Sequence, residues 1–225
     1  MAKYFKKKPY RNGDIISEFI HDLYSSNEYI HILFVRTPTT GDWLDKILID
    51  CPNVLRILYD THKLKDFSCH PSTNIIEHDT LEQVLGSEGR RFDLICVDTF
   101  HEFSYSKSDL SLLFAYLTER GTMVCHDCFP PSNTMAVPKY IDGGWCGETY
   151  IAFIDFAFHH PELFYGLLNI DTGIGIISKI QLKLLRNQFN KEKQQKLLSM
   201  REDGGEVYTY FHENCKQMMN IIGFV

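Results

Sequence analysis

Short apolar runs recur along the first half of the chain and alternate with segments in which apolar residues follow a helical period. This order is typical of a parallel sheet whose strands are joined by right-handed crossover helices. Helices are expected over residues 41–50 and 107–120, the second closed by Gly121 as a C-terminal cap. Five strands are expected, over residues 30–35, 55–59, 74–77, 92–97 and 122–125.

The second half of the chain predicts an antiparallel end to the sheet. Two apolar segments, residues 163–170 and 174–178, are separated by Asp171-Thr172-Gly173, which has the length and chemistry of a hairpin turn. Three helices are expected around this hairpin: one over residues 148–159, a polar-rich one over residues 180–200 that is stopped by Asp203-Gly204-Gly205, and one within residues 206–225.

Composition places the chain among globular proteins. It has 225 residues, 44% of them hydrophobic and 13% aromatic, which is ample material for a core and excludes a disordered chain. The length favours a single domain over residues 1–225. Within it we expect an N-terminal basic and helical extension at residues 1–28, an α/β core at residues 29–178 and a C-terminal helical extension at residues 179–225.

Charge and apolar patterning exclude several classes of protein. The net charge of −6 argues against a nucleic-acid binder, which neutralises phosphates with basic residues. The basic cluster between Lys3 and Arg11 is interpreted as a solvated tail, although it could also steer an anionic ligand or touch a membrane surface. No run is apolar enough for a signal peptide or a membrane span, so a cytoplasmic protein is expected. The seven cysteines are odd in number and several lie in apolar runs, which predicts free thiols rather than structural disulfides.

Polar residues follow each of the first five expected strands. In an open α/β sheet ligands bind beyond the carboxyl ends of the strands, so these residues are the candidates for a site. An aspartate in the position of Asp60, after the second strand, can accept the hydroxyls of a ribose, although it can equally cap a turn. In chain order the candidates are Arg36, Thr37 and Gly41, then Asp60, then Asp79 and Thr80, then Asp98 and His101, and then His126 and Asp127.

Four stretches of the sequence resemble class I S-adenosylmethionine-dependent methyltransferases. These are residues 92–101, which end in Val-Asp-Thr-Phe-His, residues 117–128, which end in Cys-His-Asp-Cys, residues 145–152 (Trp-Cys-Gly-Glu-Thr-Tyr-Ile-Ala) and residues 171–177 (Asp-Thr-Gly-Ile-Gly-Ile-Ile). They are most similar to a bacterial branch whose fourth strand ends in Ile-Asp-x-x-His and whose fifth ends in His-Asp-Cys, a branch rich in enzymes that modify sugars, capsules and other glycans. The resemblance covers most of the chain up to the expected hairpin. It implies a Rossmann-like methyltransferase fold, with a seven-stranded, mostly parallel sheet and a terminal antiparallel hairpin.

The resemblance also implies a cofactor, S-adenosylmethionine, lying across the first four strands. It assigns Asp60 to the ribose, Asp79 and Thr80 to the adenine, the loop with Arg36, Thr37 and Gly41 to the methionine moiety, and Asp98 to the reacting end.

The chain departs from the family after the first strand. There the family has an acidic residue followed by Gly-x-Gly, whose glycines let the backbone approach the cofactor closely. This chain instead has Arg36, Thr37 and Pro38, which should narrow or reshape the pocket. Arg36 could pair as a bidentate donor with the cofactor's carboxylate or with an anionic substrate. It could also fill a site that no longer binds the cofactor, because a fold does not guarantee a function.

Two histidines and two aspartates are the candidates for catalysis. Methyl transfer needs alignment of the acceptor, the methyl group and the sulfur, and a base that removes the acceptor's proton. His126 and His101 are the candidate bases, with His126 preferred, although either could instead be a hydrogen-bonding side chain at a strand end. Asp98 and Asp127 could hold one hard cation such as Mg²⁺, together with water and a substrate diol. A zinc site at the two cysteines that flank His126 and Asp127 is disfavoured, because alternate residues of a strand end point to opposite faces.

Two functions from different classes fit these observations. The first is an S-adenosylmethionine-dependent methyltransferase that modifies a hydroxyl or amine of a small molecule or glycan intermediate, with a homodimer expected by analogy. The second is a methyltransferase-like scaffold that has lost catalysis and binds a partner or glycan intermediate. An RNA or DNA methyltransferase is disfavoured because no Asn-Pro-Pro-Tyr-like motif follows the fourth strand. A serine hydrolase is disfavoured because the chain has no Gly-x-Ser-x-Gly elbow.

Overall fold

The structure is a computed structural model that describes residues 20, 23, 27, 29–37, 53–60, 73–77, 80–202 and 204–222. For residues 59–60 and 73–77 it describes the backbone alone. The helix expected over residues 41–50 and two candidate site residues, Gly41 and Asp79, lie outside the described residues.

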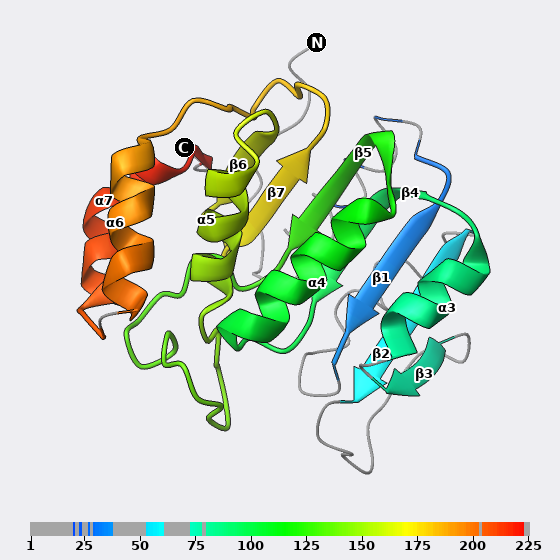
Figure 1. The fold of residues 1–225 in the computed structure, drawn as a ribbon, viewed down its shortest axis with the longest axis horizontal. Helices are drawn as coiled ribbons and strands as arrows, with labels where there is room; N and C mark the ends of the chain where they lie inside the picture. The colour runs from blue at the N-terminus through cyan, green and yellow to red at the C-terminus, as the bar shows by residue number, and fades with distance from the viewer. Residues whose placement is uncertain are drawn as a thin grey trace, which may run out of the picture.

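A mixed sheet forms the centre of the molecule (Figure 1). Its strand order is β3-β2-β1-β4-β5-β7-β6-β8. The first five strands in that order are mutually parallel, β7 is antiparallel to both of its neighbours, and β8 is parallel to β6. The strands are β1 (Ile32–Arg36), β2 (Val54–Asp60), β3 (Thr73–Glu77), β4 (Phe92–Asp98), β5 (Leu117–Cys125), β6 (Phe164–Leu168), β7 (Ile174–Ser178) and β8 (Ile221–Ile222).

This topology confirms the predicted fold class. All seven expected strands are present, and the last two form the expected antiparallel hairpin, with Phe164 opposite Ser178 and Leu168 opposite Ile174. The two-residue strand β8 is an addition that the sequence pattern did not predict.

Alternation of side chains along the strands gives the sheet two apolar faces. Leu33 and Val35 of β1 belong to one core cluster, whereas Ile32 and Phe34 belong to another, which also holds the buried Ile20. A strand covered on both faces reads as a continuous apolar run, which is why these strands could be recognised in the sequence. The first face is covered by α3 (Leu81–Glu88), α4 (Phe103–Ala115) and α5 (Thr149–His159) (Figure 1).

The helix predicted over residues 107–120 was placed too late in the chain. It is α4, which ends at Ala115, and β5 already begins at Leu117. Leu117 is fully buried opposite Phe92, while the next register pair joins Leu94 to Thr122, so residues 118–121 bulge out of the ladder. Burial of Leu117 against Phe92 therefore places it in a strand, although the spacing of apolar residues predicts a helix there. Gly121 is not a helix cap, because it lies within β5. There the backbone passes close to Leu117, whose Cγ would lie 2.6 Å from a Cβ added at Gly121.

The single helix predicted over residues 180–200 is also wrong. Helix α6 begins only at Lys191 and runs to Glu202, and the preceding segment carries an isolated bridge between Tyr165 and Arg186. Leu185 packs in the cluster on one face of the sheet, whereas Leu197 packs in the cluster on the other face. One straight helix cannot reach both faces, so the chain crosses the sheet edge in irregular structure and becomes helical afterwards.

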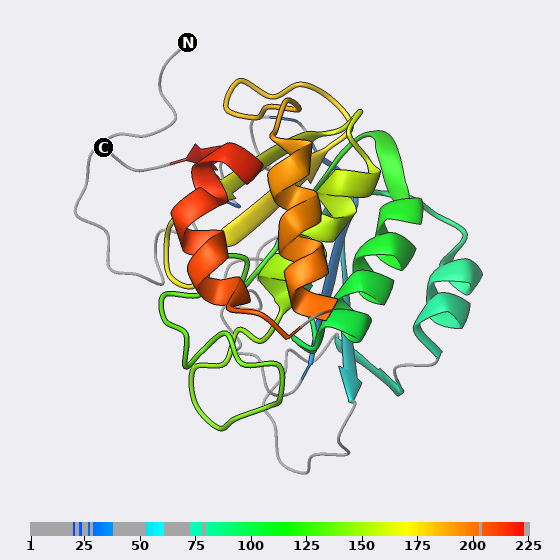
Figure 2. The same ribbon diagram turned by 60° about the vertical axis from the view of Figure 1, so that its left-hand side comes forward.

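The two helices after β7 pack into the core of the molecule. Helix α7 (Val207–Met218), which the sequence predicted within residues 206–225, lies beside α6 (Figure 2). Leu197 of α6 and Phe211 and Met218 of α7 are buried in the same cluster as α5. The division of the chain into one domain with two extensions stays a prediction. Over the residues that the structure describes, no helix is long and apolar enough to cross a membrane.

Gly173 in the β6–β7 turn provides a test of this fold. Its φ is +88°, and an added Cβ would lie 2.2 Å from Cβ and 2.3 Å from the amide nitrogen of Phe129. We expect Gly173→Ala to lower the free energy of unfolding by roughly 2 to 4 kcal/mol in urea titrations, because it combines backbone strain with overpacking. Gly143→Ala is the control, with φ +99° but no described atom within 4 Å of the added Cβ. It should cost only about 1 kcal/mol of left-handed strain, and equal losses in the two variants would contradict the packing described for this turn.

Candidate functional site

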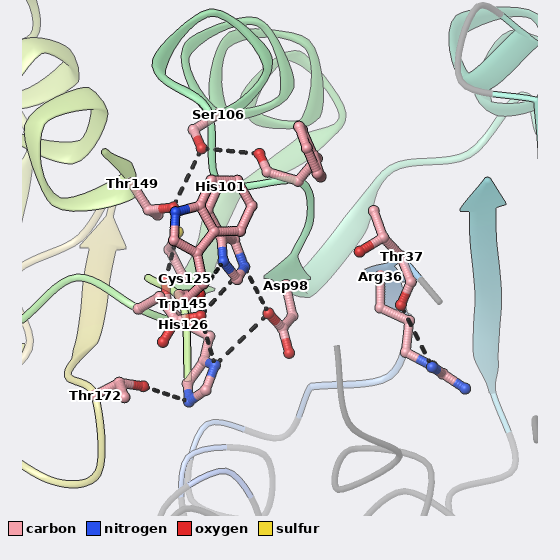
Figure 3. A network of polar contacts seen from close by, with 12 residues as sticks. Arg36, Thr37, Asp98, His101, Ser106, Cys125, His126, Trp145, Thr149 and Thr172 are labelled. Atoms are coloured by element: carbon pink, nitrogen blue, oxygen red, sulfur yellow. Dashed lines mark hydrogen bonds and ion pairs between the residues drawn. The ribbon is translucent and has the colours of Figure 1, made fainter. Parts of the chain in front are cut away.

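Strands β4 and β5 lie side by side and end in polar residues at one edge of the sheet. Asp98 is the last residue of β4, and His101 follows in the loop before α4. His126 and Asp127 follow the last residue of β5, and the amide of His126 donates to the carbonyl of Val97 at 3.0 Å. Because the strands are parallel, their carboxyl ends bring these side chains together (Figure 3). We call Asp98, His101, His126 and Asp127 the strand-end cluster.

Each imidazole of the strand-end cluster faces both carboxylates. Nε2 of His101 lies 3.4 Å from Oδ1 of Asp98 and 3.2 Å from Oδ2 of Asp127. Nδ1 of His126 lies 3.6 Å and 3.5 Å from the same two oxygens. The side chain of Asp98 is 1% exposed and that of Asp127 is 8% exposed. These charges therefore interact where water screens them little.

The outer nitrogen of each imidazole is held by a second contact. Nδ1 of His101 lies 2.8 Å from the carbonyl oxygen of Trp145, and because a carbonyl only accepts, this nitrogen carries a proton. Nε2 of His126 lies 3.1 Å from Oδ2 of Asp171 and 3.2 Å from Oγ1 of Thr172, both in the β6–β7 turn. Figure 3 shows the contact with Thr172. Sequence reasoning missed these three partners. It saw Asp171 and Thr172 only as a turn and Trp145 only as part of a motif, since the contacts depend on how β7 packs on β5.

Asp127 has a left-handed backbone, with φ of 60°. Successive residues of an extended strand point to opposite faces, and this conformation breaks that alternation. His126 and Asp127 can therefore both face the strand-end cluster. Non-glycine residues in this region carry strain and concentrate at functional sites. On either side of the pair, Cys125 and Cys128 are buried in the apolar core, and in the described part of the chain the group of residues able to hold a metal contains neither cysteine.

Burial and charge act in opposite directions on the pKa values of the strand-end cluster. Burial raises the pKa of Asp98 and Asp127, but the imidazoles, His126 foremost, outweigh it and lower both pKa values. Burial lowers the pKa of His101 and His126, but Asp127 and Asp98 outweigh it and raise both, that of His126 well above its usual value. Without a bound cation the cluster therefore favours two carboxylates and two imidazolium ions, which balance in charge.

The same atoms form a donor set for a divalent cation. One oxygen each of Asp98 and Asp127 and one nitrogen of His101 lie within 4.8 Å of one another. Two donors at right angles around Mg²⁺, each about 2.1 Å from it, lie about 3.0 Å apart, close to the spacing between Nε2 of His101 and each carboxylate. A metal-bound histidine commonly donates its other N–H to a carbonyl, as His101 does to Trp145. The residues thus fit the expected cation, with His101 added to the two aspartates, and its binding stays a prediction.

The candidate cofactor residues lie beside the strand-end cluster. Arg36 pairs in register with Asp98, and the amide of Thr37 donates to the carbonyl of Asp98 at 3.2 Å. Arg36 is 2% exposed, with Nη1 3.5 Å from the carbonyl of Thr37. Asp60 ends β2, with its side chain outside the described residues, and Thr80 directly precedes α3. The structure therefore places these residues at the carboxyl edge of the sheet, and their roles stay predictions.

Comparison with known proteins finds one family model that matches part of the chain. Residues 18–128, which include β1 to β5 and the whole strand-end cluster, match the family model described as a methyltransferase domain. No curated protein matched the sequence significantly.

Several solved structures are similar to this chain, and the first of those named here shares its fold. The SAH-bound methyltransferase PaMTH1 from Podospora anserina is similar with a TM-score of 0.50 and 16% identity, over 74% of this chain and 79% of that chain. An O-methyltransferase from Bacillus cereus in complex with SAH gives a TM-score of 0.49 and 10% identity, over 77% and 82% of the two chains. The MycE methyltransferase of the mycinamycin biosynthetic pathway, in complex with Mg, SAH and mycinamycin VI, gives a TM-score of 0.45 and 14% identity, over 79% of this chain and 54% of that one.

The raised pKa values of His101 and His126 predict a pH dependence of stability. A group whose folded pKa is raised contributes stability that is complete below its unfolded pKa and is lost as the pH rises through the folded pKa. In the presence of a chelator, the free energy of unfolding should therefore fall between about pH 6 and about pH 8. Urea unfolding at both values, with His126→Gln and with the exposed His159→Gln as control, measures this slope. The slope should flatten only in His126→Gln, and an unchanged slope there would contradict the electrostatics of the cluster.

Proposed function

We propose that this chain, in which residues 18–128 match the model of a methyltransferase domain, transfers the methyl group of S-adenosylmethionine to a hydroxyl of a small molecule, with an amine as the alternative acceptor. The observation that carries this proposal is the strand-end cluster, which lies beyond β4 and β5 and beside the end of β1. Ligands of open α/β sheets bind at this edge. Two imidazoles and two carboxylates there can bind and deprotonate an acceptor.

We assign the cofactor to the carboxyl edge of β1 to β4. Arg36 takes the place of the family's glycine motif, and its buried guanidinium suits the carboxylate of the methionine moiety. The ends of β2 and β3 lie next in the sheet, where a ribose and an adenine would follow. The proposed cofactor residues are Arg36, Thr37, Gly41, Asp60, Asp79, Thr80 and Asp98.

The reaction asks little of the protein beyond alignment and the removal of one proton. The acceptor oxygen forms a bond to the methyl carbon while the bond from that carbon to sulfur breaks, which releases S-adenosylhomocysteine (SAH). The acceptor's proton passes to Nδ1 of His126, whose other nitrogen is held by Asp171 and Thr172. A divalent cation bound by Asp98, Asp127 and His101 would neutralise the carboxylates, favour a neutral His126 and lower the pKa of the acceptor hydroxyl.

A sugar or glycan intermediate is our finer proposal for the acceptor. Trp145 lies beside His101, with ring centroids 5.3 Å apart, and Phe100 and Tyr140 pack against Trp145 at 5.1 Å and 5.2 Å. Tyr140 is 44% exposed. The exposed ring of Tyr140, packed on the buried Trp145 and Phe100, offers a flat apolar surface to the apolar face of a sugar, while adjacent hydroxyls suit the carboxylate and imidazole groups of the cluster. Homodimer formation and a cytoplasmic location stay predictions.

Asp60→Ala tests the cofactor assignment. Charge-assisted hydrogen bonds are worth about 1.5 to 3 kcal/mol, so the loss of the ribose carboxylate should weaken binding of S-adenosylmethionine roughly tenfold or more in calorimetry. Glu82→Ala, on the exposed side of α3, is the control and should bind as the parent does. Unchanged affinity in Asp60→Ala would remove the ribose assignment. A parent that binds neither S-adenosylmethionine nor SAH would favour the non-catalytic scaffold.

His126→Ala tests the proposed base. It should lower kcat about 10² to 10⁴-fold while the affinity for S-adenosylmethionine stays within a few-fold, because a general base acts only in the transition state. SAH release with a panel of sugars and other hydroxylated small molecules is the assay, and His159→Ala, whose side chain is 56% exposed, is the control.

A chelator separates the metal role from the base role. If a cation held by Asp98 and Asp127 activates the acceptor hydroxyl without the help of His126, EDTA abolishes turnover, added Mg²⁺ restores it, and His126→Ala loses much less activity. An active enzyme that is indifferent to both changes would refute both roles and leave alignment as the source of catalysis.

A further inference from the structure

Arg201, in the last turn of α6, contacts two segments that adjoin His101, one through a hydrogen bond to its backbone and the other along the chain. Its Nε donates to Oε1 of Glu148 at 2.9 Å and its Nη2 donates to Oε2 at 3.1 Å. Its Cζ lies 3.8 Å from the ring centroid of Phe103, the first residue of α4. Arg201 therefore makes a two-pronged ion pair with one segment and a cation–π contact with the other.

The Glu148 segment holds the backbone of His101. The amide of Glu148 donates to the carbonyl of His101 at 2.8 Å. Gly147 has φ of +54°, and an added Cβ there would lie 2.2 Å from the same carbonyl oxygen, so the two backbones pass in close contact. Three residues before Glu148, the carbonyl of Trp145 accepts from the ring of His101. Both the ring and the main chain of His101 are thus held by residues 145–148.

The Phe103 segment adjoins His101 along the chain. Phe103 is two residues after His101 and begins α4, so a shift of its ring moves the loop that carries the histidine. The Glu148 side chain is 10% exposed and that of Arg201 is 30% exposed, so their pairing is partly shielded from water. Loss of either partner would leave a poorly solvated charge.

We propose that Arg201 of α6 and Glu148, the residue before α5, are positioning residues that together form a clamp, which fixes His101 at the methyl-transfer site. The inference rests on the proposed function in that it assigns His101 to that site. Neither residue touches the strand-end cluster with its side chain in any contact described above. They act through the carbonyl of His101 and through the start of α4.

A second ion pair in the same region gives a matched control. Nζ of Lys107 in α4 lies 2.9 Å from Oδ2 of Asp155 in α5, and it also lies 5.6 Å from the ring centroid of Phe103. The Lys107 pair therefore joins α4 to α5 and contacts the same ring as Arg201. It does not reach Gly147 or Glu148 in the contacts that the structure gives.

The experiment compares Arg201→Ala, Glu148→Gln and their double variant with Lys107→Ala. Hydrogen exchange of the Glu148 amide, which donates to His101, should accelerate roughly tenfold or more in the clamp variants and stay within about threefold of the parent in Lys107→Ala. The kcat for SAH release should fall roughly tenfold to a hundredfold, with the affinity for S-adenosylmethionine unchanged within a few-fold. Because the two residues act as one unit, the double variant should lose no more than the worse single variant. Arg201→Lys keeps the positive charge but lacks the two guanidinium N–H donors that face Glu148, so it should recover part of the lost activity.

The outcomes separate the clamp from simple stabilisation and from the proposed function. Arg201→Ala and Lys107→Ala are compared by how much the exchange rate at Glu148 and kcat change for a given loss in Tm. If these changes are the same in both variants, Arg201 is only a stabilising residue and the clamp is refuted. Additive losses in the double variant would also refute it. If the parent releases no SAH with any acceptor, the proposed function fails, and the exchange measurement alone decides whether the clamp exists. If Arg201→Ala does not fold, the comparison of Glu148→Gln with Lys107→Ala carries the same decision.

Discussion

Two carboxylates and two imidazoles share one small buried volume at the ends of β4 and β5, and without a bound cation each favours its charged form because the others are charged. A lone buried charge costs several kcal/mol, so loss of one partner leaves the rest uncompensated. The surrounding structure meets this constraint from three directions. The left-handed backbone of Asp127 turns its carboxylate toward the histidines, the β6–β7 turn holds His126, and residues 145–148 hold His101. The β6–β7 hairpin and the segment before α5 therefore hold the two histidines in place in addition to completing the fold.

The sequence predicted the parts of the molecule that depend on local pattern. Strands buried on both faces leave continuous apolar runs, so the seven main strands and the parallel direction of the first five could be predicted directly. The juxtaposition of Asp98 with His126 followed from the same order, because neighbouring parallel strands end at the same edge. The turn at Asp171 predicted the hairpin, since its residues favour the backbone conformation that a tight reversal needs.

Features that depend on tertiary contacts could not be predicted in this way. Leu117 and Gly121 look like the end of a helix, but burial of Leu117 opposite Phe92 pulls them into β5. Leu185 and Leu197 share a helical period although they pack on opposite faces of the sheet. The partners of the histidines and the pairing of Glu148 with Arg201 join segments far apart in the chain, so no local spacing marks them. A motif could point to Trp145 and Glu148, yet only the fold shows what they hold.

Buried thiols are spread over the parts of the molecule described above. The cysteines concerned are all buried thiols: Cys96, Cys125, Cys128, Cys146 and Cys215. Burial raises the pKa of the Cys128, Cys146 and Cys215 thiols, so little reactive thiolate forms while the native packing is intact. An alkylating reagent consequently reacts with each thiol only at the rate at which its own surroundings open. Cys215 reports on α7, Cys146 on the segment that supports His101, and Cys96 on the opposite face of the sheet. The native sequence thus supplies its own chemical reporters of local unfolding, without the introduction of a label.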